Sequence, residues 1–419
     1  MKTNLLLMLF LASSFIQSAI AMPMFARKYQ VQCDTCHAAV PRLNYTGFKF
    51  KAAGYRMPWE ISQDQDDSKL KLENYTAFVS VVNAPLQVQT DHSTQQTTTT
   101  LITNGNEIDV HPITGSWGKY WGSGFELDGL YDGSLQLNQA FLTFTAGSSN
   151  SFWSLQAGVV PTFLGYGVLD RSAAVSTPLV LSTSGNNPAL DTLFTWTGVP
   201  RGAGLTASGW LGDSFFSASV RNRLVTGANG LDALGNSNNH MGDILLSATQ
   251  FYDHVGASSA VSLFYYKGLS QIPTSLGGTT LYGDSFSHLG LAANKYLSDR
   301  VNLFSGGGWN MDQSYDALTG KPDSTLHSYG SFAGFEWFWS PLLMAGARFD
   351  QFCTDVNTPN TTILGGAGYV NWHVINWVIL SGEYQYLHND ANTSVPVGTN
   401  GGLGSMDQHI ITAQATVTF

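Results

Sequence analysis

The sequence contains little charge and, beyond its first residues, no long apolar segment. Only 11% of its 419 residues are charged, and Asp and Glu outnumber Lys and Arg by 29 to 19. An acidic chain without basic runs gives no indication of nucleic-acid binding. After residues 5–11 there is no run of about eighteen or more apolar residues, so a transmembrane helix is not expected.

Cysteine is also scarce, and two of the three cysteines lie in one motif. The stretch Cys33-Asp34-Thr35-Cys36-His37 has the spacing Cys-x-x-Cys-His. A structural zinc site needs four ligands, and no second close pair of Cys or His accompanies this one. A thioredoxin-like redox motif needs a βαβ context, which does not follow here. The remaining interpretation is c-type haem attachment, for which this spacing is typical.

In this interpretation the thiols of Cys33 and Cys36 form thioethers with the two vinyl groups of one porphyrin. His37 is then placed to ligate the iron as the proximal ligand. The sequence therefore predicts one covalently bound haem c. The third cysteine, Cys353, is interpreted as a small apolar residue on a strand face.

The first residues predict export from the cytoplasm. Lys2 provides a positive charge, residues 5–11 form a short apolar core, and Ala19-Ile20-Ala21 has the small residues of a cleavage site. A membrane anchor is the alternative, but the apolar stretch is short. We predict a signal peptide over residues 1–21 and a mature chain beginning at Met22. Haem attachment and a signal peptide together favour the periplasm of a Gram-negative bacterium, or a location beyond it.

The rest of the chain predicts an all-β, antiparallel outer-membrane β-barrel. Glycine is abundant (44 residues), aromatic residues make up 12%, and segments of about ten residues alternate between apolar and polar positions. The last segment is the clearest, because Ile411 and Ala413 alternate with Gln408 and Thr412 up to a terminal aromatic, Phe419. The same alternation, with tryptophans near segment ends, occurs at residues 362–374 and 378–388.

We count about sixteen such segments, joined by alternating short and long connections. The short connections include residues 211–213, 298–300 and 340–341, and the long ones include 226–241, 313–325 and 389–404. Two regions, 83–120 and 161–190, break the alternation. Either one of them hides an additional strand, or the second folds into the lumen as a constriction loop. A soluble β-sandwich or propeller is the alternative fold.

The chain thus divides into a signal peptide (1–21), a haem segment (22–60), a linker (61–69) and a barrel (70–419). The haem segment has six basic and two acidic residues, a net charge of +4, whereas the rest of the mature chain has 12 basic and 27 acidic residues. A lipid-facing surface cannot hold many acids, so they must crowd the lumen and the loops. We therefore expect a basic plug inside or at the mouth of the barrel, protected from protease more weakly as salt is raised.

A haem segment followed by a barrel resembles the fused monohaem cytochrome–porins of the outer membrane, whose characterised members oxidise extracellular ferrous iron. The resemblance covers about thirty-five residues, and beyond them only architecture and length match. It implies one c-type haem held inside or at the mouth of the barrel, passing electrons inward to periplasmic carriers. The resemblance does not identify the donor, so ferrous-iron oxidase activity is an expectation taken from the characterised members of the family. The matching residues are Phe25-Ala26-Arg27, Cys33 to His37, Pro41-Arg42-Leu43, Gly47-Phe48, Phe50-Lys51 and Gly54-Tyr55.

The distal ligand of the iron is left open. Met57 is the nearest downstream sulfur ligand within the haem segment, and a Met/His pair would raise the haem potential. Other candidates are Met22, Met24 and a lumen-facing histidine such as His288 or His373, and Met57 can equally be a packing residue. The aromatic residues Phe48, Phe50 and Tyr55 are expected to cover the haem face.

Three functional hypotheses follow. The first is an electron conduit across the outer membrane, whose partners are lipid, an extracellular donor, for which ferrous iron is expected, and a periplasmic carrier. The second is a diffusion porin with an accessory haem-binding segment, and the third is a haem-binding structural protein without turnover. A filled lumen favours the conduit and an open lumen favours the porin.

Overall fold

The structure is a computed structural model, and it describes most of the chain from residue 24 onward. The described residues are 24–39, 42–64, 71–91, 95–101, 107–130, 135–170, 173–176, 178–181, 203–221, 243–268, 271–273, 281–283, 286–315, 322–340, 342–375, 378–390 and 405–418. The predicted signal peptide, Met22, Trp377, Phe419 and most of the long connections lie outside these residues.

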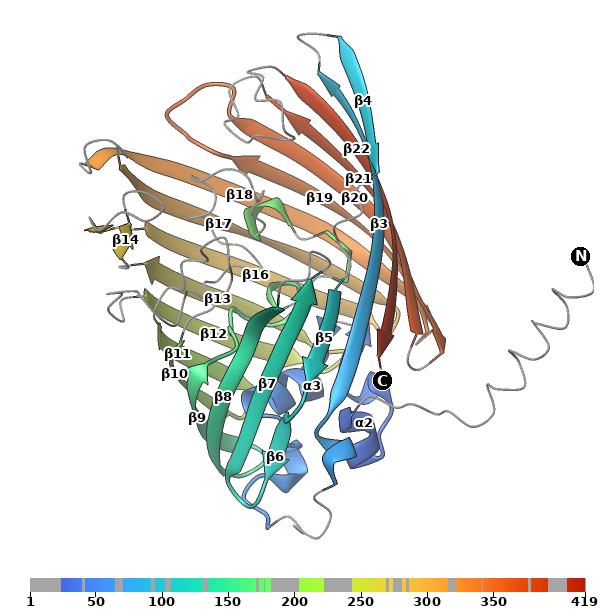
Figure 1. The fold of residues 1–419 in the computed structure, drawn as a ribbon, viewed down its shortest axis with the longest axis vertical. Helices are drawn as coiled ribbons and strands as arrows, with labels where there is room; N and C mark the ends of the chain where they lie inside the picture. Colours follow the sequence, from blue (N-terminus) through green and yellow to red (C-terminus); the bar gives the residue numbers. More distant parts are fainter. Residues whose placement is uncertain are drawn as a thin grey trace, which may run out of the picture.

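A closed antiparallel barrel forms the body of the molecule (Figure 1). Its last strand pairs with its first, so that the sheet has no free edge. The strands are β3 (Ala77–Asp91), β4 (Gln96–Leu101), β5 (Glu107–His111), β6 (Gly115–Trp117), β7 (Trp121–Leu130), β8 (Leu135–Gly147), β9 (Ser151–Val159), β10 (Ala203–Leu211), β11 (Ser214–Arg221), β12 (Asp243–Asp253), β13 (Ser259–Gly268), β16 (Phe286–Ser298), β17 (Val301–Tyr315), β18 (Pro322–Ser340), β19 (Leu343–Cys353), β20 (Thr362–Ile375), β21 (Val378–Asn389) and β22 (Met406–Thr418).

Sixteen barrel strands result when β4, β5 and β6 are taken as one interrupted strand of the described chain. β4 pairs with the second half of β3, β5 pairs with its first half, and β5 and β6 both pair with β7. Region 83–120 therefore contains the hidden strand, which restores the alternation. A separate hairpin of β14 (Gln271–Pro273) and β15 (Leu281–Gly283) lies between β13 and β16.

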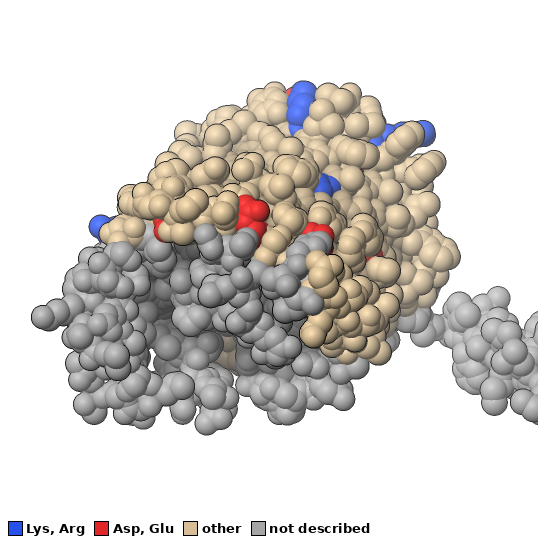
Figure 2. All heavy atoms as spheres, turned by 90° about the horizontal axis from the view of Figure 1, so that it is seen from above, with Lys and Arg blue, Asp and Glu red and all other residues tan. Residues whose placement is uncertain are grey.

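The two faces of the strands have opposite polarity. Along β20, Leu364, Val370 and Trp372 are exposed on the outside, whereas Asn371 and His373 are buried on the inside. The last strand agrees with its predicted alternation, because Gln408 and Thr412 are buried and Ile411 is exposed. Viewed from above, the described surface carries few Lys, Arg, Asp or Glu side chains (Figure 2). An apolar outer surface on a closed barrel supports an outer-membrane location.

Short turns lie at one end of the barrel. Gly212-Asp213 joins β10 to β11 and Asp299-Arg300 joins β16 to β17, as predicted. The predicted long connection 313–325 is shorter than expected, because pairing continues to Tyr315 and Pro322 despite the polar sequence. Exposed tryptophans lie near this short-turn end on several strands: Trp121, Trp153, Trp337, Trp339 and Trp372. Such a band is typical of the membrane–water interface.

The residues before β3 form small elements at the short-turn end, where α2 and α3 lie in Figure 1. They are α2 (Met24–Tyr29), η2 (Cys33–Thr35), β1 (His37–Ala39), β2 (Arg42–Leu43), α3 (Tyr45–Ala52), η3 (Pro58–Glu60) and η5 (Leu72–Asn74). We refer to residues 24–64 as the plug, because its side chains and carbonyls bond to inward-facing residues of the wall. Within the described residues, no helix has the length and apolar content needed to cross a membrane.

The second irregular region folds inward, as one of the two alternatives predicted. Its described part, residues 161–170, 173–176 and 178–181, includes η6 (Gly167–Leu169) and η7 (Leu179–Leu181), and we call it the inner loop. Leu164, Val168 and Leu169 are almost completely buried against wall residues such as Phe264 and Phe304. Both regions thus depart from the regular alternation of strands and connections. The first contains an interrupted strand, and the second forms a loop in the lumen.

Candidate functional site

The Cys-x-x-Cys-His motif forms one tight turn followed by an extended residue. Cys33 begins the 3-10 turn η2, and the backbone N–H of Cys36 donates to the Cys33 carbonyl oxygen at 3.2 Å. His37 then begins β1, and both cysteines are present as thiols in half-buried positions. Two thiols at the two ends of one turn, with an imidazole next to them, are the donor set that the sequence predicts.

Asn44 holds this turn in shape. Its backbone N–H donates to the Cys36 carbonyl at 2.9 Å, and its Nδ2 donates to the carbonyls of Asp34 (2.8 Å) and Thr35 (3.1 Å). The Asn44 side-chain oxygen accepts from the Gly47 N–H at 2.9 Å and so caps the N-terminus of α3. One side chain therefore closes the motif and starts the helix that packs beside it.

Gly47 allows α3 to approach the motif closely. A Cβ atom at this position would lie 2.0 Å from the Cys36 carbonyl oxygen, which is a backbone atom. Such a distance is incompatible with any larger residue unless the turn or the helix moves. Gly47 is thus required by the contact between helix and turn.

Burial makes both thiols harder to deprotonate. It raises the pKa of Cys33 and, together with the nearby Cys33 thiol, raises the pKa of Cys36 to about 12. A protonated thiol is a weak nucleophile and a poor ligand for a free metal ion. Among the described residues, no group of three or more His, Cys, Asp or Glu side chains is arranged to hold a metal ion directly.

The plug is joined to the barrel by its basic residues and by its backbone. Arg42 pairs with Glu336 at 2.5 Å and Lys51 with Asp170 at 2.6 Å. The other four basic side chains contact carbonyls of the wall or lie against aromatic rings. Arg27 donates to Thr76 O, Lys28 to Ser116 O, Arg56 to Gly118 O and Trp121 O, and Lys49 lies 4.9 Å from the Trp210 ring centre.

Opposite charges meet at Arg42 and Lys51, in agreement with the expected charge complementarity. Wall strands near the short turns also present hydroxyls to the plug. Ser154 donates to the Ala52 carbonyl at 2.7 Å and Thr145 to the Ala53 carbonyl at 3.0 Å, so the end of α3 is bonded to β8 and β9. These groups bind the plug without carrying a charge.

Arg42 lies in a buried polar network that sequence reasoning missed. Its side chain is 3% exposed and that of Glu336 is 1% exposed. Glu336 also accepts from Asn302 Nδ2 at 2.8 Å and from the Tyr369 hydroxyl at 3.1 Å. Burial lowers the pKa of Arg42, but the Glu336 carboxylate and the Tyr296 hydroxyl outweigh it and hold the pKa above its usual value. The only local signal was an acidic residue at an inward position of an aromatic strand.

The aromatic residues predicted to cover the haem lie on two different sides of α3. Phe48 is completely buried, and its ring packs on Phe215 at 5.0 Å and on Tyr166 at 5.7 Å, both outside the plug. Phe50 and Tyr55 instead pack on Phe25 of α2. Phe48 therefore anchors the plug to the wall. Residues two apart on a helix point in nearly opposite directions, which explains why Phe48 and Phe50 pack on different sides. That these three rings cover the haem face stays a prediction.

The candidate distal ligands lie at separate places. Met57 is completely buried and precedes η3, next to Arg56, whose guanidinium bonds to carbonyls of the turn between β6 and β7. Met24 is buried in α2. His288 is buried inside the barrel 4.9 Å from the Phe264 ring, and His373 lies inside β20 near the short turns. The role of Met57 as a ligand stays a prediction.

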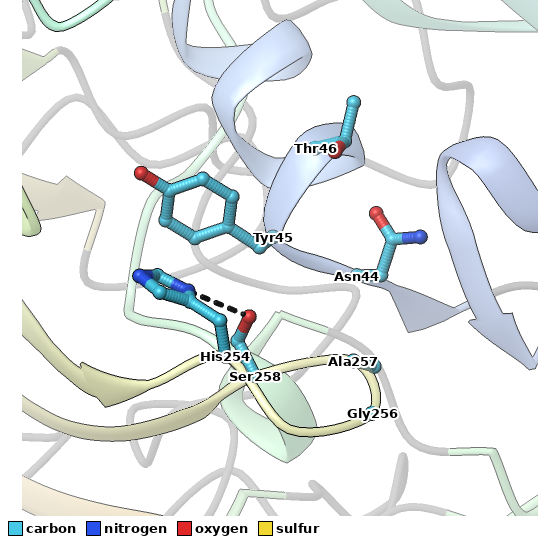
Figure 3. A pocket seen from close by; sticks show the side chains of 7 residues that line it. All are labelled: Asn44, Tyr45, Thr46, His254, Gly256, Ala257 and Ser258. Atoms are coloured by element: carbon cyan, nitrogen blue, oxygen red, sulfur yellow. Dashed lines mark hydrogen bonds between the residues drawn. The ribbon is translucent and has the colours of Figure 1, made fainter. Parts of the chain in front are cut away.

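A cavity of about 260 Å³ opens beside the start of α3. Figure 3 shows the Tyr45 ring above His254, whose Nδ1 lies 3.1 Å from Ser258 Oγ. The same imidazole contacts Asp213 with Nε2 at 3.2 Å, and Tyr45 donates to Asp213 at 3.4 Å. These contacts join two short turns of the wall to the plug.

The inner loop is fixed by a second group of charged residues. Arg348 pairs with Asp350 at 2.8 Å and donates to the carbonyl and hydroxyl oxygens of Ser176. The Ser176 N–H donates to both oxygens of Glu383, and Asn371 donates to Ala173 O at 2.6 Å. The loop is thus held across the lumen by β19, β20 and β21.

Comparisons with known proteins identify the fold. No protein-family model and no curated protein sequence matches the chain. Solved structures do: the outer membrane channel DcaP of Acinetobacter baumannii aligns with a TM-score of 0.52 at 12% identity, over 82% of this chain and 97% of that one. OprB of Pseudomonas putida aligns with a TM-score of 0.52 at 10% identity, over 82% and 93% of the two chains. OmpF of Salmonella typhi gives 0.51 at 10% identity, over 82% and 97%. The chain has a porin-like barrel fold.

Proposed function

We propose that this protein is an outer-membrane electron-transfer protein whose plug carries one covalently attached haem c. The observation that supports the proposal most directly is that the Cys-x-x-Cys-His turn belongs to a plug bonded into the barrel wall. A site in a plug at the short-turn end faces one side of the membrane directly and the other side through the barrel. The resemblance of the plug to fused cytochrome–porins points in the same direction.

The residues present fit such a haem. Cys33 and Cys36 lie on one turn and would form the thioethers, His37 would be the proximal ligand, and Asn44 and Gly47 keep the turn in shape. When bound, the haem supplies a one-electron redox centre whose potential depends on its axial ligands and its burial. The protein's own contribution is to hold the turn in one shape, through the contacts of Asn44 and Gly47.

In the proposed direction, an extracellular donor, for which we propose ferrous iron, would be oxidised by one electron to ferric iron. A periplasmic carrier at the short-turn end, where the plug lies, would be reduced by that electron. The haem held by Cys33, Cys36 and His37 would supply the redox centre between them. The protein would act as a ferrous-iron oxidase in the outer membrane of a Gram-negative bacterium. Liposomes holding an oxidised carrier, with ferrous iron added outside, test the direction. Haem reduction only by donors on the short-turn side would contradict it.

A haem stain on a denaturing gel tests the attachment. The wild-type chain should stain, and the double variant Cys33→Ala/Cys36→Ala should not. Cys353→Ala is the matched control, because Cys353 is a buried cysteine on β19, and this variant should stain like the wild type. Staining that persists in the double variant would exclude the assignment.

Met57 is proposed as the distal ligand. Met57→Leu conserves side-chain volume, so its cost in folding free energy should be below about 1.5 kcal/mol. Loss of the methionine–iron charge-transfer band with retained haem would support the ligand role. An unchanged spectrum would leave Met57 as a packing residue only.

A diffusion porin with an accessory haem segment is the second candidate, and the fold likeness to porins favours it. The plug and the inner loop both occupy the barrel interior, which favours the electron-transfer role over free diffusion. Single-channel conductance of the full chain in a planar bilayer separates the two. Large, steady conductance without haem dependence would support the porin.

A further inference from the structure

The strand that begins with His37 is connected to the barrel wall by a short path. β1 pairs with β2 so that His37 lies opposite Leu43 and Ala39 lies opposite Arg42. The Arg42 side chain then forms the buried ion pair with Glu336 of β18. One backbone pair, one step along β2 from Leu43 to Arg42 and one ion pair thus link the predicted iron ligand to the wall.

Wall residues hold the Glu336 carboxylate in place for its ion pair with Arg42. Asn302 and Tyr369 each donate a hydrogen bond to its carboxylate, and Arg42 adds the positive charge that balances it. A buried carboxylate without its cation is strongly destabilising. Arg42 of the plug therefore supplies the charge that this buried carboxylate of the wall requires.

We propose that Arg42 and Glu336 are positioning residues for the haem iron. The pair fixes β2 against β18, and the pairing of β2 with β1 transmits that position to His37. The haem-dependent part of this inference rests on the proposed function, whereas the anchoring of β1 does not. The sequence did not predict that Arg42 and Glu336 form an ion pair.

The second plug ion pair provides a matched control. Lys51 at the end of α3 binds Asp170 of the inner loop at 2.6 Å, with side chains 20% and 5% exposed. It also joins the plug to the barrel interior, but it involves neither β1 nor β2. Lys51→Gln therefore removes a comparable charge without releasing the strand that carries His37.

The first measurement uses the full-length, haem-loaded protein. We compare Arg42→Gln, Glu336→Gln, Arg42→Lys and Lys51→Gln with the wild type by midpoint potential and by the electron paramagnetic resonance of the ferric haem. We call Arg42→Gln and Glu336→Gln the anchor variants. Both should shift the midpoint potential and alter the axial-ligand signals of the haem. Arg42→Lys should recover part of the shift, and Lys51→Gln should match the wild type. Haem-replete anchor variants identical to the wild type would overturn the proposal.

The second measurement does not depend on haem. Amide hydrogen exchange over residues 36–45 should be at least about tenfold faster in the two anchor variants. Each variant removes one member of the buried Arg42–Glu336 pair and leaves the other without its partner. The same amides should be unchanged in Lys51→Gln. If the wild type carries no haem, the proposed function fails and this exchange still decides the anchoring. Unchanged exchange in folded anchor variants would refute the positioning role.

Discussion

Gly47 shows how one residue can control the shape of the motif. Its Cα lies against the Cys36 carbonyl, and Asn44 binds three carbonyls of the same turn. The turn is therefore shaped by contacts within the plug, before any cofactor is considered. Substitutions at these two positions act on the motif without changing its chemistry.

Gly47→Ala should damage the site. The added Cβ would meet backbone, which cannot rotate away, so we expect a loss of about 1–3 kcal/mol in the unfolding free energy of the plug. Haem staining should fall with it. Gly382→Ala is the control, because a Cβ there meets nothing within 4 Å. Equal staining in the two variants would show that the turn tolerates the displacement.

The pKa of Cys36 predicts slow alkylation in protein prepared without haem. The thiolate is the reactive form, and burial raises the pKa from 9.0 to about 12. At pH 8 the folded chain should therefore react with iodoacetamide between about tenfold and a thousandfold more slowly at Cys36 than the unfolded chain. The rate should increase with pH through the range 8 to 11. Mass spectrometry measures the alkylation of Cys36 at each pH. A rate that no longer increases above pH 8 would contradict the raised pKa.

At the scale of elements, the plug is a short segment whose stability comes from the wall. Its helices are six and eight residues long, which is too short for an isolated helix to be stable. Phe48, Arg42 and the end of α3 each bond or pack to different strands. The plug and the barrel should therefore lose structure together.

Protease should cleave the plug slowly in the folded protein. We expected from the sequence that salt would weaken this protection, but the two ion pairs found are largely buried, and salt screens buried pairs little. Protection should therefore persist at about 1 M salt. Unfolding the barrel should expose the sites, and the fragments can be read on a gel. Rapid cleavage with an intact barrel would show that the plug is not anchored.

At the scale of the whole molecule, the plug and the inner loop both bond to inward-facing residues of one closed barrel. Sixteen-stranded porins leave an aqueous channel, whereas here two segments enter the lumen from different parts of the sequence. The inner loop is held by Arg348, Glu383 and Asn371, and the plug is held by Arg42 and Lys51. The two segments also contact each other, because Lys51 of the plug pairs with Asp170 of the inner loop.

Deleting residues 24–64 should increase conductance across a planar bilayer above that of the full chain. The deletion leaves Glu336 buried without its cation, so we combine it with Glu336→Gln to limit the loss of stability. Heat-modifiable migration on a gel reports whether the barrel is folded. A folded deletion variant that conducts no better than the full chain would assign the closure to the inner loop.

The sequence by itself determined what depends on local order. Alternation of apolar and polar residues predicted the barrel and its strand faces, and the spacing of Cys33, Cys36 and His37 predicted the attachment motif, which stays a prediction for the haem itself. Each of these is set by neighbours along the chain, because a strand turns its side chains with a period of two.

Only the tertiary structure decided the contacts between distant segments. Arg42 and Glu336 are 294 positions apart, and nothing near either residue indicates the other. The interrupted strand β4 to β6 is likewise recognised only by its pairing with β3 and β7. The inner loop is recognised only by the wall side chains that bind it, such as Asn371. Such contacts depend on barrel closure, which brings together strands that periodicity describes only one at a time.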